Sequence, residues 1–275
     1  MIENVIIGVQ KSATSWLYES LNISPNIAVR NDKREMGMFQ EDMQYLEWYN
    51  ENFIGKGPFT EVSVDYIKNI GALEILIENN PNVKVNVILR APKDRFYSSV
   101  NWLFRKGKLN ITSETISTVH LEMSEIKDLL SRSLYGEDLQ KLSDLNVEVN
   151  VWNYEWIRDD MNGFLKKFSK VNYGDRRIAT NAPKRKVSSN KVLDKMESFF
   201  HRNDIHLLGK IISKISDAIP NRYVKVTQNK ELDAKLSDIF RRDQTLLTDM
   251  FVDSKVNFYG FDQEVFKRWY TRECL

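Results

Sequence analysis

The sequence predicts an α/β fold, in which helices flank a central and mainly parallel β-sheet and a helical part follows toward the C-terminus. Short apolar runs typical of strands alternate with helical patterns over roughly the first 170 residues, and this alternation is the order of βαβ units. From about residue 196 to about Val252 the apolar periodicity is mostly helical. We therefore expect one domain over residues 1–275, with an α/β core over about 1–195 and a helical extension over about 196–275.

The first three predicted elements lie within the first 30 residues. Val5–Val9 is a continuous apolar run, which is the pattern of a strand buried on both faces. A helix is predicted over residues 13–21, because Leu17 and Leu21 lie one helical turn apart. Ile27–Val29 is predicted as a second short strand.

A helix, a strand, a helix and a strand follow in that order. The apolar residues of 43–53 fit one helix face, and Phe59–Val62 is a strand candidate. Ile70–Ile77 is predicted as a helix that ends before Pro81. Val83–Arg90 gives the strongest strand signal in the chain, because it is rich in β-branched residues and ends at a polar turn.

The last elements of the core continue this alternation. Pro92 suits the first turn of a helix over Lys93–Phe104. The other predicted elements are two polar-faced helices within Glu114–Lys141, a strand at Val147–Trp152 and a helix over Asp159–Phe168. Asn172–Asn190 shows little apolar periodicity and carries a basic run, so we expect a loop there.

Composition and charge exclude several classes of function. Lys and Arg number 40 against 38 Asp and Glu, a net charge of +2, which argues against general electrostatic binding to nucleic acid or to an anionic membrane. The single cysteine, Cys274, excludes an intramolecular disulfide and a cysteine-based zinc site. The apolar run at 5–9 is too short for a signal peptide or a membrane span. We expect a reduced, cytoplasmic protein with no stable membrane insertion and no metal.

The first predicted strand leads into a loop rich in hydroxyl and basic side chains. Lys11 supplies a cation, and the loop opens a predicted helix, whose first N–H groups and positive end favour an anion. The hydroxyl donors of the loop are Ser12, Thr14 and Ser15. Only two residues separate Gly8 from Lys11, whereas a Walker A motif has four residues before its Gly-Lys pair. The pattern predicts a P-loop-like site for fewer phosphates, and an ordinary strand-to-helix turn with a solvated lysine is the alternative.

A second basic residue is expected at the same edge of the sheet. Arg90 ends the strongest predicted strand, and Ser98 lies in the helix that follows. In open α/β sheets, ligands bind outside the carboxyl ends of the strands. We therefore expect Lys11 and Arg90 to meet at one anion site.

Together, these two segments resemble the sulfotransferases that use 3′-phosphoadenosine 5′-phosphosulfate (PAPS). Lys11–Leu17 is similar to the 5′-phosphosulfate loop of that family, and Leu89–Ser98 is similar to its 3′-phosphate segment. The weaker similarities, which extend the match to roughly residues 3–195, are Lys33–Phe39 and Glu61–Tyr66 with segments of carbohydrate sulfotransferases, Asn153–Ile157 with an element after a late strand, and Pro183–Asn190 with a basic loop over the cofactor. Ala13 departs from the family's loop, which has a glycine there, and Met36-Gly37 departs from its Pro-His pair.

The resemblance implies a PAPS-dependent sulfotransferase and assigns residues to its cofactor. The residues that it places at the 5′-phosphate are Lys11, Ser12, Ala13, Thr14 and Ser15. Arg90 and Ser98 would bind the 3′-phosphate, which distinguishes PAPS from ATP. The remaining contacts are Trp16 and Tyr154 with the adenine or ribose, and Arg185 and Lys186 in the basic loop over the cofactor.

Sulfuryl transfer also needs an acceptor hydroxyl and a general base that deprotonates it. No histidine lies between the two phosphate segments, where many small-molecule sulfotransferases carry their base. Glu35 lies there, at the position of the catalytic glutamate of the carbohydrate group, so the resemblance implies Glu35 and Lys11 as the catalytic residues, with Asp65 as a second candidate base. The expected acceptor is a hydroxyl of a carbohydrate or glycoconjugate. No nucleic-acid partner is expected, and the sequence leaves the oligomeric state open.

Three other functions stand as alternatives. An ATP-dependent kinase or phosphotransferase would share the strand–loop–helix site. It needs the full Walker spacing, which is absent, and an acid after a later strand, where Arg90 stands. A catalytically inactive relative would bind the nucleotide with the same fold. A nucleic-acid-binding module would use the basic run at 183–186, although such a run is usually a solvated loop.

Overall fold

The computed structural model describes residues 1–12, 17, 21, 28–29, 43–53, 58–105, 109, 115–169 and 229–271. These residues pack as two compact units, and each is described by itself. The first unit holds the described residues up to Pro92, from Leu134 to 169 and from Phe240 onward. The second unit holds Lys93–Ser133 and residues 229–239, with the same gaps. The single domain expected from the sequence stays a prediction.

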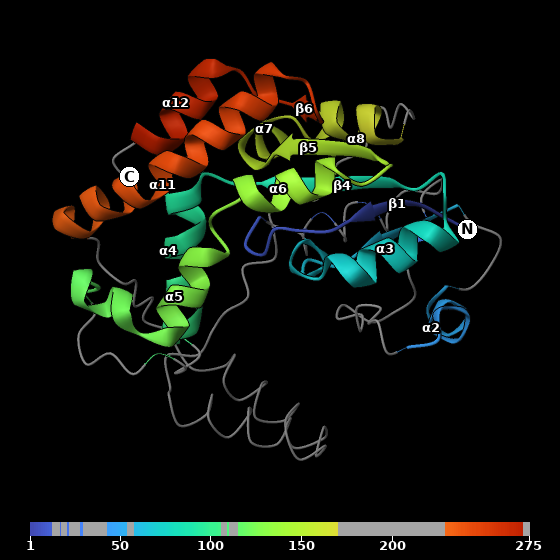
Figure 1. Cartoon of the computed structure of the whole chain (residues 1–275), viewed down its shortest axis with the longest axis horizontal. Coiled ribbons are helices and arrows are strands. Elements are labelled where there is room, and N and C mark those ends of the chain that lie inside the picture. Colours follow the sequence, from blue (N-terminus) through green and yellow to red (C-terminus); the bar gives the residue numbers. More distant parts are fainter. Residues whose placement is uncertain are drawn as a thin grey trace, which may run out of the picture. The chain divides into compact units, whose positions relative to one another are not determined.

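A parallel sheet forms the centre of the first unit. Its strands are β1 (Ile2–Ile6), β2 (Ala28–Val29), β3 (Phe59–Val62), β4 (Lys84–Leu89), β5 (Glu148–Asn153) and β6 (Asn257–Tyr259). Their order is β2-β3-β1-β4-β5-β6, and every neighbouring pair is parallel. Figure 1 shows β1, β4 and β5 side by side. The predicted α/β fold with a mainly parallel sheet is confirmed.

Two strands differ from the sequence-based expectation by more than one residue at an end. The first strand begins at Ile2, three residues before the predicted start at Val5, and the predicted residues 7–9 continue its hydrogen bonding beyond the strand end. Thus the Ile7 amide donates to the Asn86 carbonyl at 3.0 Å. Strand β6, inside the region predicted as helical, was missed because three residues are too short to show a period.

The helices follow the predicted order with two corrections. Their bounds are α2 (Tyr45–Asn52), α3 (Ile70–Asn79), α4 (Pro92–Arg105), α5 (Ser124–Ser131), α6 (Gly136–Ser143), α7 (Tyr154–Asp159), α8 (Met161–Ser169), α11 (Lys230–Val252) and α12 (Gln263–Thr271), with 3₁₀ turns at Tyr66–Lys68 and Thr118–Glu122. The predicted pair within Glu114–Lys141 is a 3₁₀ turn followed by α5 and α6. The predicted helix over Asp159–Phe168 is α8, which begins two residues later, and α7 was not predicted. The two helices are separated at Asp160, whose backbone leaves the helical region and whose side chain accepts from the Gly163 amide at 2.8 Å.

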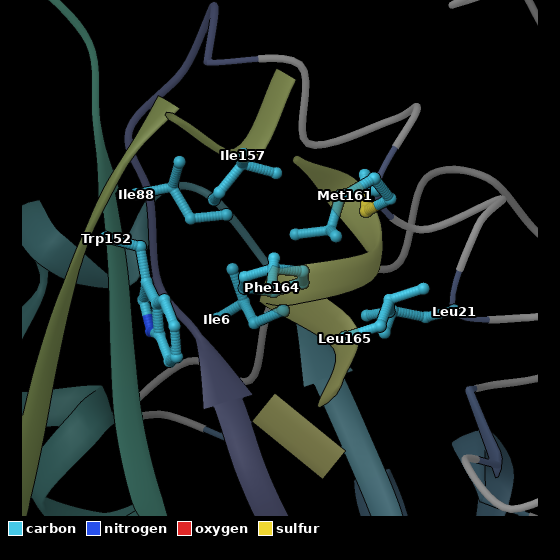
Figure 2. Packing of buried hydrophobic residues seen from close by; sticks show 9 residues of the cluster. Ile6, Leu21, Ile88, Trp152, Ile157, Met161, Phe164 and Leu165 are labelled. Atoms are coloured by element: carbon cyan, nitrogen blue, oxygen red, sulfur yellow. The ribbon is translucent and has the colours of Figure 1, made fainter. Parts of the chain in front are cut away.

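The core beside the sheet is apolar and joins three strands to α7 and α8. Ile6, Ile88 and Trp152 project from β1, β4 and β5. They pack against residues of α7 and α8, among them Ile157, Met161, Phe164 and Leu165 (Figure 2). Leu17 and Leu21, which are helical as predicted, join the same cluster. The Trp152 indole nitrogen donates to the Asn86 side-chain oxygen at 3.0 Å, so this large ring is buried without losing its hydrogen bond.

A buried arginine holds the second unit together. Arg95, on α4, is 1% exposed, and its Nη1 donates to the Leu129 carbonyl at 2.7 Å and to the Ser133 hydroxyl at 3.1 Å. Tyr97, two residues on, donates to Asp233 of α11 at 2.5 Å. Arg95 therefore has a structural role within the segment that resembles a phosphate motif. In the ranges that the structure covers, no helix is long and apolar enough to cross a membrane.

Candidate anion-binding site at the ends of β1 and β4

The order of the strands puts a topological switch point between β1 and β4. The strands that follow β1 in the sequence, β2 and β3, lie on one side of it, whereas β4 and β5 lie on the other. The connections that leave two such neighbouring strands diverge and open a crevice at the carboxyl ends, where open α/β sheets bind ligands. Lys11 follows β1 and Arg90 follows β4, so the two predicted cations lie at this point.

The loop after β1 has backbone conformations that few residue types can adopt. Gly8 has a φ of +150°, and a Cβ there would approach the Val64 carbonyl and the Ile67 side chain to 3.1 Å each. Only glycine suits this conformation and this close approach. Lys11 has a φ of +71°, which is uncommon for a residue with a side chain. Strained positions of this kind cluster at ligand-binding loops.

Ser12 presents a buried hydroxyl in the same loop. The residue is 2% exposed, and its Oγ finds no hydrogen-bond partner among the residues with described positions. Buried polar atoms are nearly always paired, so an exception calls for an explanation. A ligand oxygen that accepts from this hydroxyl would supply one.

Asp65 lies beside the loop. The Gln10 side-chain amide donates to Asp65 Oδ1 at 3.1 Å, and Asp65 stands in the turn that follows β3. The Asp65 carboxyl is therefore bonded to the residue that precedes Lys11, so the second candidate base lies beside the loop.

The Arg90 guanidinium makes two described contacts, and its buried Nε makes none within the described residues. Its Nη1 donates to the Lys11 carbonyl at 2.9 Å, and its Cζ lies 5.2 Å from the centre of the Tyr154 ring, a cation–π distance. Its buried Nε has no hydrogen-bond partner within the described ranges. The structure thus places the Arg90 side chain between the Lys11 carbonyl and the Tyr154 ring, and the roles of the three residues stay predictions.

Side chains also bind both polar groups of the peptide between Arg90 and Ala91. The Tyr135 hydroxyl donates to the Arg90 carbonyl at 2.9 Å, and the Ala91 amide donates to Glu155 Oε1 at 3.3 Å. Glu155 is in the first turn of α7, whose N-cap, Asn153, accepts from the Trp156 amide at 3.0 Å. The peptide that carries Arg90 is therefore fixed in orientation.

Sequence reasoning missed the roles of Tyr135 and Glu155. Glu155 entered it only as part of a segment that resembles a family element, and no motif pointed to Tyr135. The one local signal is the Asn153 cap before α7, which indicates a helix start and hence the place of Glu155. Nothing in the local sequence indicates that Tyr135 reaches Arg90.

Several predicted site residues lie elsewhere or outside the described part of the chain. Ser98 lies in α4, in the second unit, and is half-buried, so its role stays a prediction. The predicted residues outside the described ranges are Ala13, Thr14, Ser15, Trp16, Glu35, Arg185 and Lys186. Of the aromatic residues near residue 50, Trp48, Phe53 and Phe59 are at most 5% exposed and pack on one another, so they belong to the core.

The arrangement suits an anion with more than one charged group. Lys11 and Arg90 are cations at the ends of adjacent strands, and the hydroxyl of Ser12 and the Nε of Arg90 are buried donors without a partner in the described part of the chain. Charged hydrogen bonds from fixed donors are the strong ones, and Arg suits phosphate oxygens in particular. This set of donors therefore suits the oxygens of a phosphorylated ligand.

Comparisons with known proteins agree with this chemistry. A family model described as the sulfotransferase domain matches residues 3–173 of the chain. A crystal structure of a sulfotransferase from Alicyclobacillus acidocaldarius has a similar fold, with a TM-score of 0.61 and 16% identity over 98% of this chain and 99% of that chain. No curated protein sequence matches the chain. At this identity the structural likeness concerns the fold, whereas the family match covers more than half of the sequence.

Proposed function

The chain belongs to the sulfotransferase domain family, and on that premise we propose that it transfers a sulfuryl group to a hydroxyl of a carbohydrate or glycoconjugate, with Glu35 as the general base. The chain is an enzyme of the sulfotransferase type, and the family takes its sulfuryl group from PAPS. The contact between Arg90 and the Lys11 loop carries the proposal, because it joins the two segments that the resemblance assigns to the two phosphate ends of PAPS.

The described residues fit a nucleotide with separated phosphates. Lys11 and Ser12 offer a cation and a buried hydroxyl in the loop after β1. The Arg90 Nε is a second buried donor, beside the Tyr154 ring. Two donor groups at the ends of two strands suit a 5′-phosphate at one and a 3′-phosphate at the other. ATP, which lacks a 3′-phosphate, would leave the Arg90 donor unused.

Each residue has a distinct task in the proposed reaction. When bound, PAPS supplies the sulfuryl group and leaves as 3′-phosphoadenosine 5′-phosphate. Lys11 stabilises the negative charge that develops at the 5′-phosphate end, where a fixed cation favours the transition state most. Arg90 binds the 3′-phosphate and thereby orients the donor for attack.

Glu35 would accept the proton of the acceptor hydroxyl. Its support is the similarity of Lys33–Phe39 to the segment that carries the catalytic glutamate of carbohydrate sulfotransferases, and the same similarity supports a carbohydrate acceptor. Asp65 is the second candidate, because its carboxyl is bonded to Gln10 beside the loop. The single cysteine favours a reducing compartment, so the proposal keeps a cytoplasmic location.

Calorimetric binding of 3′-phosphoadenosine 5′-phosphate, with AMP and ATP as controls, tests the donor site. We expect the bisphosphate to bind far more tightly than AMP or ATP, and Arg90→Ala to remove about 10-fold to 100-fold of that preference. Arg158→Ala is the matched control, because it removes an exposed arginine of α7 that pairs with Asp159 instead. Equal effects of the two substitutions would refute the proposed site, and a preference for ATP would favour an ATP-dependent phosphotransferase.

Turnover with carbohydrate acceptors and PAPS tests the base. Glu35→Gln should lower kcat by about 10²–10⁴-fold while the affinity for the bisphosphate stays unchanged. Asp65→Asn is the comparison, and it should keep most of the activity. If Asp65→Asn lost turnover and Glu35→Gln kept it, the two roles would be exchanged. If wild type bound the bisphosphate but transferred nothing to any acceptor hydroxyl, the chain would be a catalytically inactive relative.

A further inference from the structure

The C-terminal helices contribute a buried carboxylate that lies outside the residues matched by the family. Asp243, on α11, is 5% exposed. Its Oδ1 accepts from the amides of Tyr135 at 2.8 Å and Gly136 at 2.6 Å, and its Oδ2 accepts from the Tyr270 hydroxyl of α12 at 3.1 Å. Every one of these residues belongs to the first unit.

Asp243 serves as the N-cap of a different helix. Helix α6 begins at Gly136, and its own N-cap residue, Tyr135, gives no side-chain cap. The first amides of a helix need an acceptor, and the positive end of the helix favours a carboxylate. Asp243 supplies both the acceptor and the negative charge, although it lies 107 residues away from Gly136 in the sequence. Gly136 allows the approach, because a Cβ there would lie 3.1 Å from Asp243 Oδ1 and 2.8 Å from the Cβ of Leu246.

Tyr135, whose amide donates to Asp243, also binds Arg90. Tyr135 is fully buried, and while its amide donates to Asp243, its hydroxyl donates to the Arg90 carbonyl at 2.9 Å. The position of the phenol follows from the position of its backbone, which Asp243 fixes. A continuous set of hydrogen bonds therefore runs from α12 and α11, through the start of α6, to the end of β4.

We propose that Asp243 and Tyr135 are positioning residues that hold Arg90 in the orientation in which it selects a 3′-phosphorylated nucleotide. The inference rests on the proposed function of Arg90, and it names the residues that make the site select the 3′-phosphate. Neither residue touches the nucleotide in this scheme. Tyr135 holds the Arg90 carbonyl and Glu155 holds the next amide, while the guanidinium lies over Tyr154 and donates to the Lys11 carbonyl.

The cost of burying Asp243 supports a positioning role. Within the ranges that the structure describes, no Lys or Arg pairs with Asp243, and the charged group that acts on it from α6 is another acid, Asp138. Burying a carboxylate without a cation is unfavourable, and a well-packed apolar residue at such a place is often the more stable choice. Three aligned donors at one carboxyl fix the start of α6 in one position, which an apolar contact would not do.

The test compares selectivity rather than stability. We would measure the affinities for 3′-phosphoadenosine 5′-phosphate and for AMP by calorimetry, and take their ratio in wild type, Tyr135→Phe, Asp243→Asn and Arg90→Ala. Tyr135→Phe removes only the hydroxyl. Asp243→Asn keeps an oxygen for the two amides but removes the negative charge that strengthens both hydrogen bonds. Each should lower the ratio about 3-fold to 10-fold, the effect of one hydrogen bond. In the Arg90→Ala background, Tyr135→Phe should change nothing further.

Glu137→Gln is the matched control, because it breaks an exposed pair with Arg242 at 3.6 Å between the same two helices. A general loosening of α6 against α11 would lower the affinities for both nucleotides and leave the ratio unchanged. If Arg90→Ala lowered the ratio but Tyr135→Phe and Asp243→Asn behaved like Glu137→Gln, the positioning role would be overturned and the proposed donor site would stand. If wild type showed no preference for the bisphosphate, the donor site itself would fail. Should Asp243→Asn not fold, Tyr135→Phe alone decides.

Discussion

The two strand ends that meet at the site are built in different ways. At the end of β4, side chains bind both polar groups of the peptide after Arg90, with Tyr135 on its carbonyl and Glu155 on the Ala91 amide. At the end of β1, the loop holds Lys11 at a positive φ and buries the Ser12 hydroxyl, which has no partner in the described part of the chain. Each end keeps one buried donor without a partner in the described residues, the Ser12 hydroxyl and the Arg90 Nε, but at the end of β4 other side chains also hold both polar groups of the peptide.

This difference indicates that the end of β4 serves ligand specificity and the end of β1 serves catalysis. A donor whose position is set before the ligand arrives loses little freedom on binding and can discriminate between ligands. The Ser12 hydroxyl would gain its contact when the ligand binds, and a cation in the same loop can respond to charge that develops in the reaction. Changes at β4 should therefore alter selectivity, and changes at β1 should alter turnover.

The largest effect is expected at the end of β1. Lys11→Ala should lower turnover by about 10²–10³-fold, because it removes the cation at the leaving-group end. Folding should be little affected, since alanine and lysine meet the same restriction at a φ of +71°. Lys84→Ala, which removes a cation that pairs with Glu148 at the opposite end of the sheet, should keep near-normal turnover. Equal losses of turnover in Lys11→Ala and Lys84→Ala would show that the end of β1 has no special role in turnover.

The next effect concerns pH and Asp243, which supports the end of β4. Burial raises the pKa of the Asp243 carboxyl to about 6, against the opposing hydrogen bonds from Gly136, Tyr270 and Tyr135 and with a further rise from the charge of Asp138. Between about pH 4 and pH 6 the folded protein therefore holds a proton that the unfolded chain has released. This contribution to stability is present below about pH 4 and is lost as the pH rises through about 6.

Urea unfolding of wild type and Asp243→Asn from pH 4 to pH 7 measures this contribution. The stability of wild type relative to the variant should fall by up to about 3 kcal/mol over that range. Other groups titrate in both proteins and cancel in the difference. Parallel stability curves would show that the Asp243 carboxyl keeps an ordinary pKa.

A smaller loss of stability is expected from a single methyl group at the start of α6. Gly136→Ala would place a Cβ 2.8 Å from the Cβ of Leu246, and overpacking of this kind costs about 1–3 kcal/mol. Urea denaturation measures the loss, and Glu137→Ala, at the exposed neighbouring position, should stay within about 0.5 kcal/mol of wild type. Selectivity for the 3′-phosphate should fall in Gly136→Ala alone. Unchanged stability and selectivity there would argue that α6 does not need its close approach to α11.

The smallest effect separates charge from orientation at the end of β4. Arg90→Lys keeps the positive charge but loses the planar group that lies over Tyr154 and donates to the Lys11 carbonyl. We expect a drop of about 10-fold in affinity for 3′-phosphoadenosine 5′-phosphate, with the affinity for AMP unchanged. Calorimetry measures both. Full affinity in the lysine variant would mean that charge alone selects the ligand.

Local patterns in the sequence predicted the strands β1 to β5 and the two strand ends that carry Lys11 and Arg90. The bounds of β3 were predicted as the structure has them, and β4, which is rich in β-branched residues, differs by one residue at each end. The placement of Lys11 and Arg90 followed from a general rule, since the carboxyl ends of parallel strands share one edge. Neither inference needed a contact between distant residues.

Only the tertiary structure decided what holds Arg90. Tyr135 reaches it across 45 residues, Glu155 binds the next amide across 64, and Asp243 caps α6 across 107. A local cap such as Asn153 follows a fixed spacing and can be read from the sequence. A cap supplied by another helix follows no spacing, because packing brings its two partners together. The local sequence therefore determined where the strands end, and the tertiary fold determined how the Arg90 side chain at the end of β4 is held.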